Sequence, residues 1–191
     1  MSDKVFSFVW EDEQDLDSEL CQQIIDKFES DPDKYDGVIG GGEVDKSMKN
    51  SIDLVLSGDH WKDIREVLSE RLSLLIDRRR HLDGLHDISC SGFQVQKTPA
   101  DAEVGYDWHI DTLISRHPSG KLHERVLTFI WYLNDDFEDG GTQFNDQTVT
   151  PVTGKLLSFP PGVTMVHRGI PPKGGDKYIL TGWLWSPLHI L

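Results

Sequence analysis

The second half of the chain alternates between apolar and polar residues in short runs, and this pattern most restricts the folds open to it. Glycine, proline, asparagine and aspartate fill the gaps between the runs, as they do in tight turns. Many short strands joined by tight turns predict a closed antiparallel barrel or jelly roll. The candidate strands cover residues 88–97, 106–112, 124–134, 141–144, 147–152, 155–160, 163–168 and 177–185.

The first part of the chain has the period of helices instead. Apolar residues four apart predict a helix over 16–28, with Asp15 or Asp17 as its N-cap. A second helix is expected from about Asp59 to Arg80, where apolar residues step by three and four.

A short strand over 5–10 and a glycine-rich loop over 30–50 complete this first part. We expect a single domain over residues 1–191, mainly β with N-terminal helices. Residues 1–86 form a mainly helical support on one face, and residues 87–191 form the jelly-roll core.

The overall charge excludes some partners. The chain carries 33 acidic and 19 basic residues, a formal net charge of -14. This field repels phosphate backbones, so we expect no nucleic-acid partner. We expect no membrane span, because no stretch approaches the roughly 20 apolar residues needed, and no secretory signal. Cys21 and Cys90 are expected as reduced, buried thiols, and the protein as cytoplasmic.

Two His-x-Asp triplets occur, 109-HID-111 and 81-HLD-83. Chance alone supplies about one such triplet in this composition, so their surroundings must distinguish them. The first lies on a candidate strand, where residues i and i+2 project into the same cavity. The second lies where a helix ends and is expected to be solvated and free of metal. The alternative for His109 is a barrel histidine that bonds only to Asp111.

A second imidazole, that of His167, lies on another candidate strand directly before a Gly/Pro turn. Two neutral imidazoles and one carboxylate form the facial triad of non-haem Fe(II) oxygenases. The single carboxylate leaves net positive charge on Fe(II), which can then accept an anionic co-substrate. A structural zinc site would fill all four positions, often with cysteine, and neither cysteine is near in sequence. We therefore expect Fe(II) at His109, Asp111 and His167.

Lys177 lies on the last candidate strand, and alternation places it on one face with Thr181 and Trp183. If that face lines the barrel, the lysine is buried and needs an anion. Otherwise it extends to water from the start of the strand. Tyr132 is on the hydroxyl-bearing face of strand 124–134. It either hydrogen-bonds the same anion or is an ordinary barrel tyrosine.

Four segments carry a resemblance to a known family. They are 106-YDWHID-111, 125-RVLTFIWYLND-135 followed by 140-GGTQF-144, 151-PVTGKLLSFP-160, and 167-HRGIPPKGGDKYILTGW-183. In this order they resemble the 2-oxoglutarate- and Fe(II)-dependent dioxygenases of the prolyl 4-hydroxylase type, over roughly Ile88 to Trp185. The resemblance implies a double-stranded β-helix, a jelly-roll or cupin-like barrel.

The same resemblance implies roles for particular residues. His109, Asp111 and His167 would be the metal ligands. Lys177 would bind the distal carboxylate of 2-oxoglutarate, helped by Tyr132 and Thr181. Tyr106 and Trp183 would line the substrate or co-substrate pocket.

The implied reaction hydroxylates an unactivated C–H bond with O2 and releases succinate and CO2. The expected substrate is a prolyl residue in a peptide or protein, and L-ascorbate is the expected reductant. The alternatives are a lysyl or free amino-acid hydroxylase, a non-catalytic barrel that senses metal or 2-oxoglutarate, and a metal-dependent cupin without 2-oxoglutarate. Nucleic-acid demethylation is disfavoured by the charge.

The connection over 113–125 concentrates basic residues in an otherwise acidic chain. We expect it to form much of the pocket rim, with Arg116 in the substrate pocket. It is either a solvated loop or a lid that recognises a carboxylate or an acidic peptide.

Overall fold

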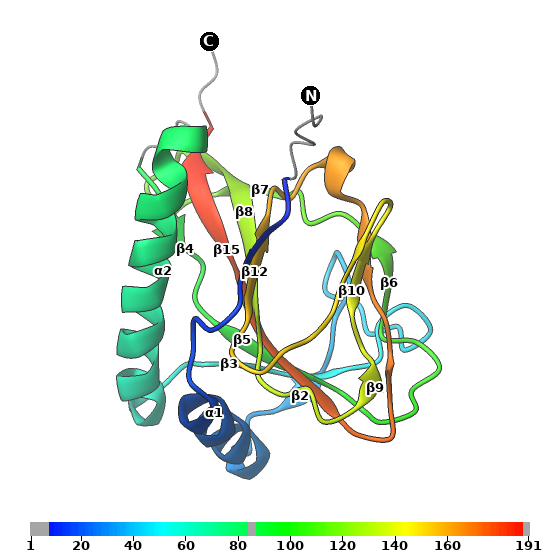
Figure 1. The fold of residues 1–191 in the computed structure, drawn as a ribbon. Helices are drawn as coiled ribbons and strands as arrows, with labels where there is room; N and C mark the ends of the chain where they lie inside the picture. Colours follow the sequence, from blue (N-terminus) through cyan, green and yellow to red (C-terminus); the bar gives the residue numbers. More distant parts are fainter. Residues whose placement is uncertain (1–7, 84–86, 189–191) are drawn as a thin grey trace, which may run out of the picture.

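The computed structural model describes residues 8–83 and 87–188, which fold as a mainly β structure with two α-helices near the N-terminus (Figure 1). The first helix is α1 (Ser18–Ser30), and the second is α2 (Lys62–Asp83), which follows a 3-10 turn, η1 (Asp59–Trp61). Among the described residues, neither helix is long and apolar enough to cross a membrane.

Nine strands form one antiparallel sheet. Its order is β1-β12-β8-β15-β5-β3-β2, with β4 also paired to β15 and β7 also paired to β8. The bounds are β1 (Trp10–Asp12), β2 (Tyr35–Asp36), β3 (Ile52–Val55), β4 (Ser89–Cys90), β5 (Gln94–Thr98), β7 (Ile114–Arg116), β8 (Leu122–Tyr132), β12 (Leu156–Phe159) and β15 (Lys177–Pro187).

A smaller four-stranded sheet lies opposite the large one, on the side away from α2 (Figure 1). Its order is β11-β10-β13-β6. The bounds are β6 (Tyr106–His109), β10 (Thr142–Phe144), β11 (Thr148–Val149) and β13 (His167–Gly169), and a separate hairpin pairs β9 (Glu138–Asp139) with β14 (Pro172–Lys173). Two facing antiparallel sheets make the predicted double-stranded β-helix.

The helices cover the outer face of the large sheet. The side chains of Leu127, Phe129 and Trp131 in β8, and of Leu133 just after it, all pack into one core cluster with residues of both helices. This arrangement confirms the predicted apolar face of that strand. Each such side chain contributes roughly 1.5–3 kcal/mol when it leaves water, so the helices stabilise the sheet from behind and leave its inner face available.

Capping sets the start of α1. Asp17 is the N-cap, and its side chain accepts a hydrogen bond from the Leu20 N–H at 2.8 Å. Asp15, the other predicted cap, accepts a hydrogen bond from the Trp131 indole at 2.9 Å instead. That bond ties the chain before the helix to the centre of the large sheet.

A second apolar cluster fills the space between the two sheets. It includes Ile130 and Leu157 from the large sheet and Phe144 from the small one. The candidate site lies directly beside this cluster, since Ile130 also lines its cavity.

The strands depart from prediction in several places. The predicted strand over 106–112 ends at His109, so Asp111 lies just beyond β6. Residues 88–97 form two strands, β4 and β5, with Gly92 between them at a φ of 100°. Residues 163–165 form a 3-10 turn, η2 (Val163–Met165), so β13 begins only at His167. The predicted connection over 113–125 is a hairpin of β7 and the start of β8.

The first part of the chain contributes strands as well as helices. β3 was not predicted, yet it joins the large sheet beside β5, and β2 pairs with it. The predicted strand over 5–10 is described only from residue 8 onward, where β1 begins at Trp10. Cys21 is buried as predicted, but Cys90 is exposed, because its short strand lies near the end of the sheet.

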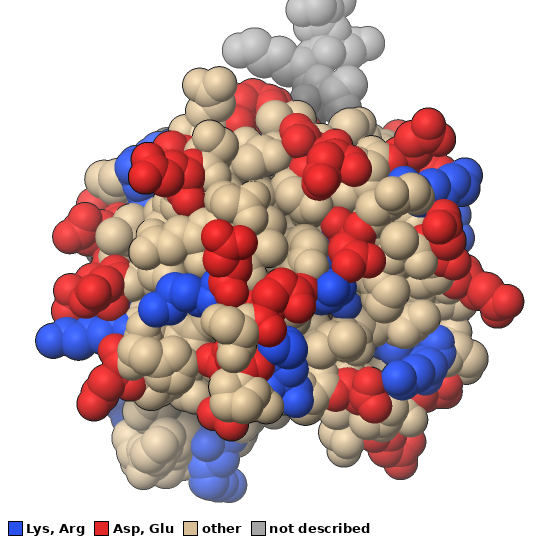
Figure 2. Space-filling model, turned by 90° about the horizontal axis from the view of Figure 1, so that it is seen from below, with Lys and Arg blue, Asp and Glu red and all other residues tan. Residues whose placement is uncertain are grey.

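The surface reflects the acidic composition. On the face seen from below, acidic side chains spread widely, and basic side chains lie singly or in small groups among them (Figure 2). No continuous basic surface is visible on that face, in keeping with the net charge of -14.

Candidate active site

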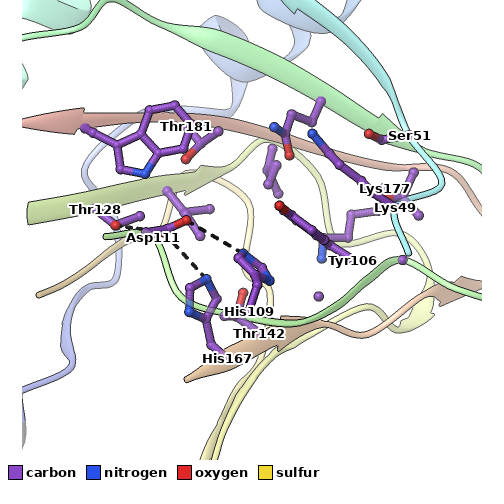
Figure 3. Close-up of a pocket in the computed structure, with 17 residues that line it drawn as sticks. Lys49, Ser51, Tyr106, His109, Asp111, Thr128, Thr142, His167, Lys177 and Thr181 are labelled. Carbon is purple, nitrogen blue, oxygen red and sulfur yellow. Dashed lines mark hydrogen bonds and ion pairs between the residues drawn. The ribbon is translucent and has the colours of Figure 1, made fainter. Parts of the chain in front are cut away.

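The His-Asp-His set predicted from the sequence comes together at the mouth of the barrel. β13 pairs with β6 so that His167 lies directly opposite His109. One ligand atom from each of His109, Asp111 and His167 lies within 4.8 Å of the others (Figure 3). Gly105 permits this close pairing, because a Cβ there would lie 2.4 Å from the Gly169 carbonyl oxygen.

The hydrogen bonds of the two histidines leave their lone pairs facing the carboxylate. His109 Nδ1 lies 2.7 Å from the Asp107 carbonyl oxygen, and His167 Nδ1 lies 2.9 Å from that of Met165. A carbonyl only accepts, so each Nδ1 carries the proton and each Nε2 does not. The Nε2 atoms lie 3.7 and 3.6 Å from the two Asp111 oxygens, too far for hydrogen bonds.

Three lone-pair donors that face one another repel unless a cation lies between them. Burial, and next the neighbouring His167, lower the pKa of His109 to about 4, so this imidazole is neutral at pH 7 and suited to bind a metal. The donor set fits a divalent transition metal with open positions. The second triplet, His81 to Asp83, lies in the last turn of α2, and its side chains are outside the described part of the structure.

Neighbouring groups fix the orientation of Asp111. The Thr128 hydroxyl donates to Asp111 Oδ2 at 2.8 Å, and Arg125 Nη1 donates to the Asp111 backbone carbonyl at 3.1 Å. Such partners orient metal ligands and tune their affinity. Thr128 lies on the hydroxyl-bearing face that alternation predicted for this strand.

Lys177 lies in the same cavity as the triad, which has a volume of about 60 Å³. Its side chain is 4% exposed, so it does not extend to water. Among the described residues it has no hydrogen-bond or ion-pair partner. Burial lowers the pKa of Lys177 to about 8. A buried ammonium without a partner is unfavourable, and an anion in the cavity would relieve that cost.

The two predicted helpers of Lys177 have other partners. Tyr132 is fully buried, and its hydroxyl donates to Thr142 at 2.6 Å. Thr142 lines the cavity, whereas Tyr132 does not. Thr181 lines the cavity, but its hydroxyl donates to the Phe129 carbonyl at 2.8 Å. In this arrangement neither hydroxyl has a hydrogen free for an anion.

The predicted pocket aromatics line the cavity. The Tyr106 ring stacks on His109 with centroids 3.6 Å apart, and Trp183 forms part of the opposite wall. Arg116 does not reach this cavity. Its guanidinium donates to the Gly120 carbonyl at 2.9 Å, and its side chain lines a second hollow at the end of the large sheet.

A buried polar cluster beside the cavity was not predicted from the sequence. Lys49 Nζ lies 2.6 Å from Asp53 Oδ2, and Ser51 donates to the other oxygen of Asp53 at 2.7 Å. The Lys49 ammonium also lies 5.2 Å from the Tyr106 ring centre, so Tyr106 lies between Lys49 and His109 (Figure 3). Lys49 comes from the stretch predicted as a loop (30–50), and Ser51 and Asp53 follow it where no element was predicted and no periodicity marks a buried position.

Comparison with known proteins identifies similar sequences. Residues 93–185 match the 2OG-Fe(II) oxygenase superfamily. A protein of Acanthamoeba polyphaga mimivirus, named provisionally as a prolyl 4-hydroxylase, is 36% identical over 70 residues. That match covers 31% of this chain and only 29% of the relative.

Several solved structures share the fold. A viral collagen prolyl hydroxylase from Paramecium Bursaria Chlorella virus-1, in complex with 2OG, has a TM-score of 0.72 at 17% identity and covers 94% of this chain and 97% of its own. A prolyl hydroxylase from Trichoplax adhaerens, in complex with a hypoxia inducible factor peptide fragment, has a TM-score of 0.76 at 20% identity, covering 93% and 83%. A Pseudomonas putida prolyl-4-hydroxylase has a TM-score of 0.65 at 21% identity, covering 94% and 92%.

Proposed function

Because residues 93–185 match the 2OG-Fe(II) oxygenase superfamily, we propose that the chain is a member of it and uses Fe(II), 2-oxoglutarate and O2 to hydroxylate a prolyl residue in a peptide or protein. The products are the hydroxylated residue, succinate and CO2. One observation carries the proposal: the buried Lys177, without an anionic partner, shares a cavity with three metal-ligand side chains.

The residues of the chain have distinct tasks in this reaction. His109, Asp111 and His167 hold the metal, and Thr128 keeps the carboxylate turned toward it. Bound iron supplies the activation of O2 for attack on an unactivated C–H bond. Lys177 pairs with the far carboxylate of 2-oxoglutarate, which fixes the orientation of the co-substrate. No side chain is needed as a general base.

Support for a prolyl substrate comes from the cavity walls and from the relatives. Tyr106 and Trp183 provide aromatic walls suited to an apolar ring. The mimivirus relative and the three solved structures described above carry prolyl hydroxylase names. Lysyl and free amino-acid substrates fit the same chemistry and are tested beside it.

The first experiment measures succinate formation from 2-oxoglutarate with Fe(II), O2 and L-ascorbate. It is run with proline-rich peptides, lysine-containing peptides and free amino acids. We expect a proline-rich peptide to stimulate turnover and to gain one oxygen atom by mass spectrometry. His109→Ala removes a metal ligand and is expected to abolish both signals.

A second variant distinguishes the other enzyme class. Lys177→Ala is expected to raise the required 2-oxoglutarate concentration greatly, whereas a cupin that needs no 2-oxoglutarate would show no such dependence. Tight His109-dependent metal binding without turnover on any candidate would count against the hydroxylase and for a sensor.

A further inference from the structure

A second hollow of about 270 Å³ lies where β7, β8, β4 and β15 meet. Its walls combine apolar surface with cationic and hydrogen-bonding side chains. Among them are Ser115, Arg116, His117, His123 and Trp185. None of these residues belongs to the triad cavity.

A β-bulge in β8 turns this hollow toward the same side of the sheet as the triad. Leu184 pairs with Leu127, but Trp185 pairs with Arg125, so Val126 is an extra residue in β8. Val126 packs against the helix-side core. Beyond it, Arg125 and His123 therefore share the inner face with Thr128, whereas strict alternation would have placed Glu124 there.

A row of stacked side chains connects the two cavities. Trp183 lines the triad cavity and Trp185 lines the second hollow. The Arg125 guanidinium lies 3.6 Å from the Trp183 ring centre and 5.4 Å from that of Trp185. The wall of the triad cavity thus continues into the second hollow.

Two polar groups of the second hollow lack partners. Within residues 8–83 and 87–188, neither the Trp185 indole N–H nor His123 Nδ1 has a hydrogen-bond partner. The His123 side chain is only 9% exposed and stacks on His117 with centroids 4.4 Å apart. Burying a polar group without a hydrogen-bond partner is unfavourable, so a ligand that forms these hydrogen bonds would relieve that cost.

The ligand chemistry follows from these groups. An indole N–H only donates, an imidazole can donate, and the Arg116 guanidinium is a permanent cation at the edge of the hollow. A carboxylate accepts from all three, and charge-assisted hydrogen bonds of this kind are strong.

We propose that the second hollow binds a carboxylate of the peptide substrate while the residue to be hydroxylated lies in the triad cavity. This inference takes its peptide substrate from the proposed function. Thr128 pairs with Trp183 and His123 pairs with Pro187, four residues farther along β15, a distance of about 13 Å at roughly 3.3 Å per residue. An extended peptide covers that distance in about four residues, so the substrate carries an acidic residue or its C-terminal carboxylate about four positions from the target.

The test is a binding measurement that needs no turnover. Fluorescein-labelled, amidated peptides carry one proline and one glutamate, spaced two to six residues apart on either side, each with a glutamine twin. A further peptide without glutamate ends in a free carboxylate. Fluorescence anisotropy gives the Kd for protein loaded with Mn(II) and 2-oxoglutarate without O2. We expect the glutamate or free-carboxylate peptide at the right spacing to bind about tenfold tighter than its neutral twin.

Three variants locate the carboxylate. Arg116→Ala and Trp185→Phe are expected to reduce the tenfold preference to about twofold or less. Lys121→Ala is the matched control, since it removes a charge from the same hairpin but from a residue that does not line the hollow. The control is expected to keep the preference. Arg116 is exposed, so its replacement does not threaten folding.

The outcomes separate this inference from the proposed function. Equal Kd values for every charged and neutral pair, or no peptide binding at all, overturn the inference. The inference is also overturned if the preference for the charged peptide persists in both Arg116→Ala and Trp185→Phe. If the protein forms succinate but the charged and neutral peptides bind with equal Kd, only this inference is overturned. If the charged peptide binds more tightly through the second hollow but no succinate forms, only the proposed hydroxylase function is overturned.

Discussion

At the scale of single residues, the site depends on which way Asp111 is turned. Its two oxygens face the two imidazole Nε2 atoms, and the Thr128 hydroxyl holds one of these oxygens. The carboxylate is therefore already positioned for a metal before one binds, and less ordering is needed on binding.

Replacing Thr128 with valine keeps the shape of the side chain and removes its hydroxyl. We expect Thr128→Val to weaken metal binding about 10–100-fold, the usual cost of losing a partner that orients a ligand. Calorimetric titration with Mn(II) measures this. The matched control is Thr181→Val on the same cavity wall, whose hydroxyl bonds to the Phe129 carbonyl. Equal affinities in the two variants would contradict this role for Thr128.

Lys177 predicts a pH dependence of 2-oxoglutarate binding. Burial lowers its pKa to about 8, so the free protein carries the ammonium below that pH and loses it above. The dianion binds the charged form, so the Kd is expected to be flat below about pH 7 and to rise about tenfold per pH unit well above pH 8.

The control for this profile is Lys177→Arg. A guanidinium stays charged over the whole range, so we expect its Kd to change little with pH. Both are measured by anaerobic titration of the Mn(II)-loaded protein. Parallel profiles for lysine and arginine would show that another group titrates.

Sequence patterns located the triad and Lys177 because His109, His167 and Lys177 lie on strands, and Asp111 follows two residues after His109, just beyond the end of β6. The same reasoning did not find Lys49 and Asp53, whose burial depends on packing between distant segments. It left open whether Tyr132 bonds the anion or is an ordinary barrel tyrosine, and in the structure its hydroxyl donates to Thr142. Alternation predicts a face but not which hydrogen bond a buried hydroxyl makes.

At the scale of elements, α2 supports the sheet and takes no part in the cavity. Leu68 is fully buried in its core face, while Val67 is 38% exposed. We expect Leu68→Ala to lower the free energy of unfolding by about 2–5 kcal/mol, and Val67→Ala to change it by about 0.5 kcal/mol or less. Urea unfolding measures both.

The folded fraction of Leu68→Ala is expected to bind metal as the unaltered protein does, since the helix lies behind the sheet. If Leu68→Ala instead lost as much metal affinity as Thr128→Val, the packing of α2 would influence the metal site. The helices themselves were predictable from apolar spacing and caps. The strands β2 and β3 were not, because two to four residues carry too little pattern.

At the scale of the whole molecule, the candidate site connects the two sheets. His109 and His167 come from the small sheet, whereas Thr128 and Lys177 come from the large one. A metal together with 2-oxoglutarate would therefore hold the barrel closed, and any ligand of the folded state stabilises it by mass action.

We expect Mn(II) at about 100 times its Kd to stabilise the fold by about 2.7 kcal/mol, raising Tm by roughly 5–10 °C in a chain of this size. Thermal unfolding followed by circular dichroism measures the shift. His109→Ala is expected to lose the whole rise in Tm. When 2-oxoglutarate is added with Mn(II), Lys177→Ala is expected to lose only the further rise that 2-oxoglutarate causes. If His109→Ala showed the same Mn(II)-dependent rise in Tm as the unaltered protein, the metal would bind at another site.

The bulge at Val126 reverses which residues of β8 face the cavity. Upstream of Val126 the odd-numbered positions face the barrel mouth, and downstream the even-numbered ones do. If β8 instead kept strict alternation through Val126, Glu124 would face the mouth in place of Arg125 and His123, with no change in the sequence. The sign of the charge at the barrel mouth therefore depends on the bulge as well as on which residues β8 contains.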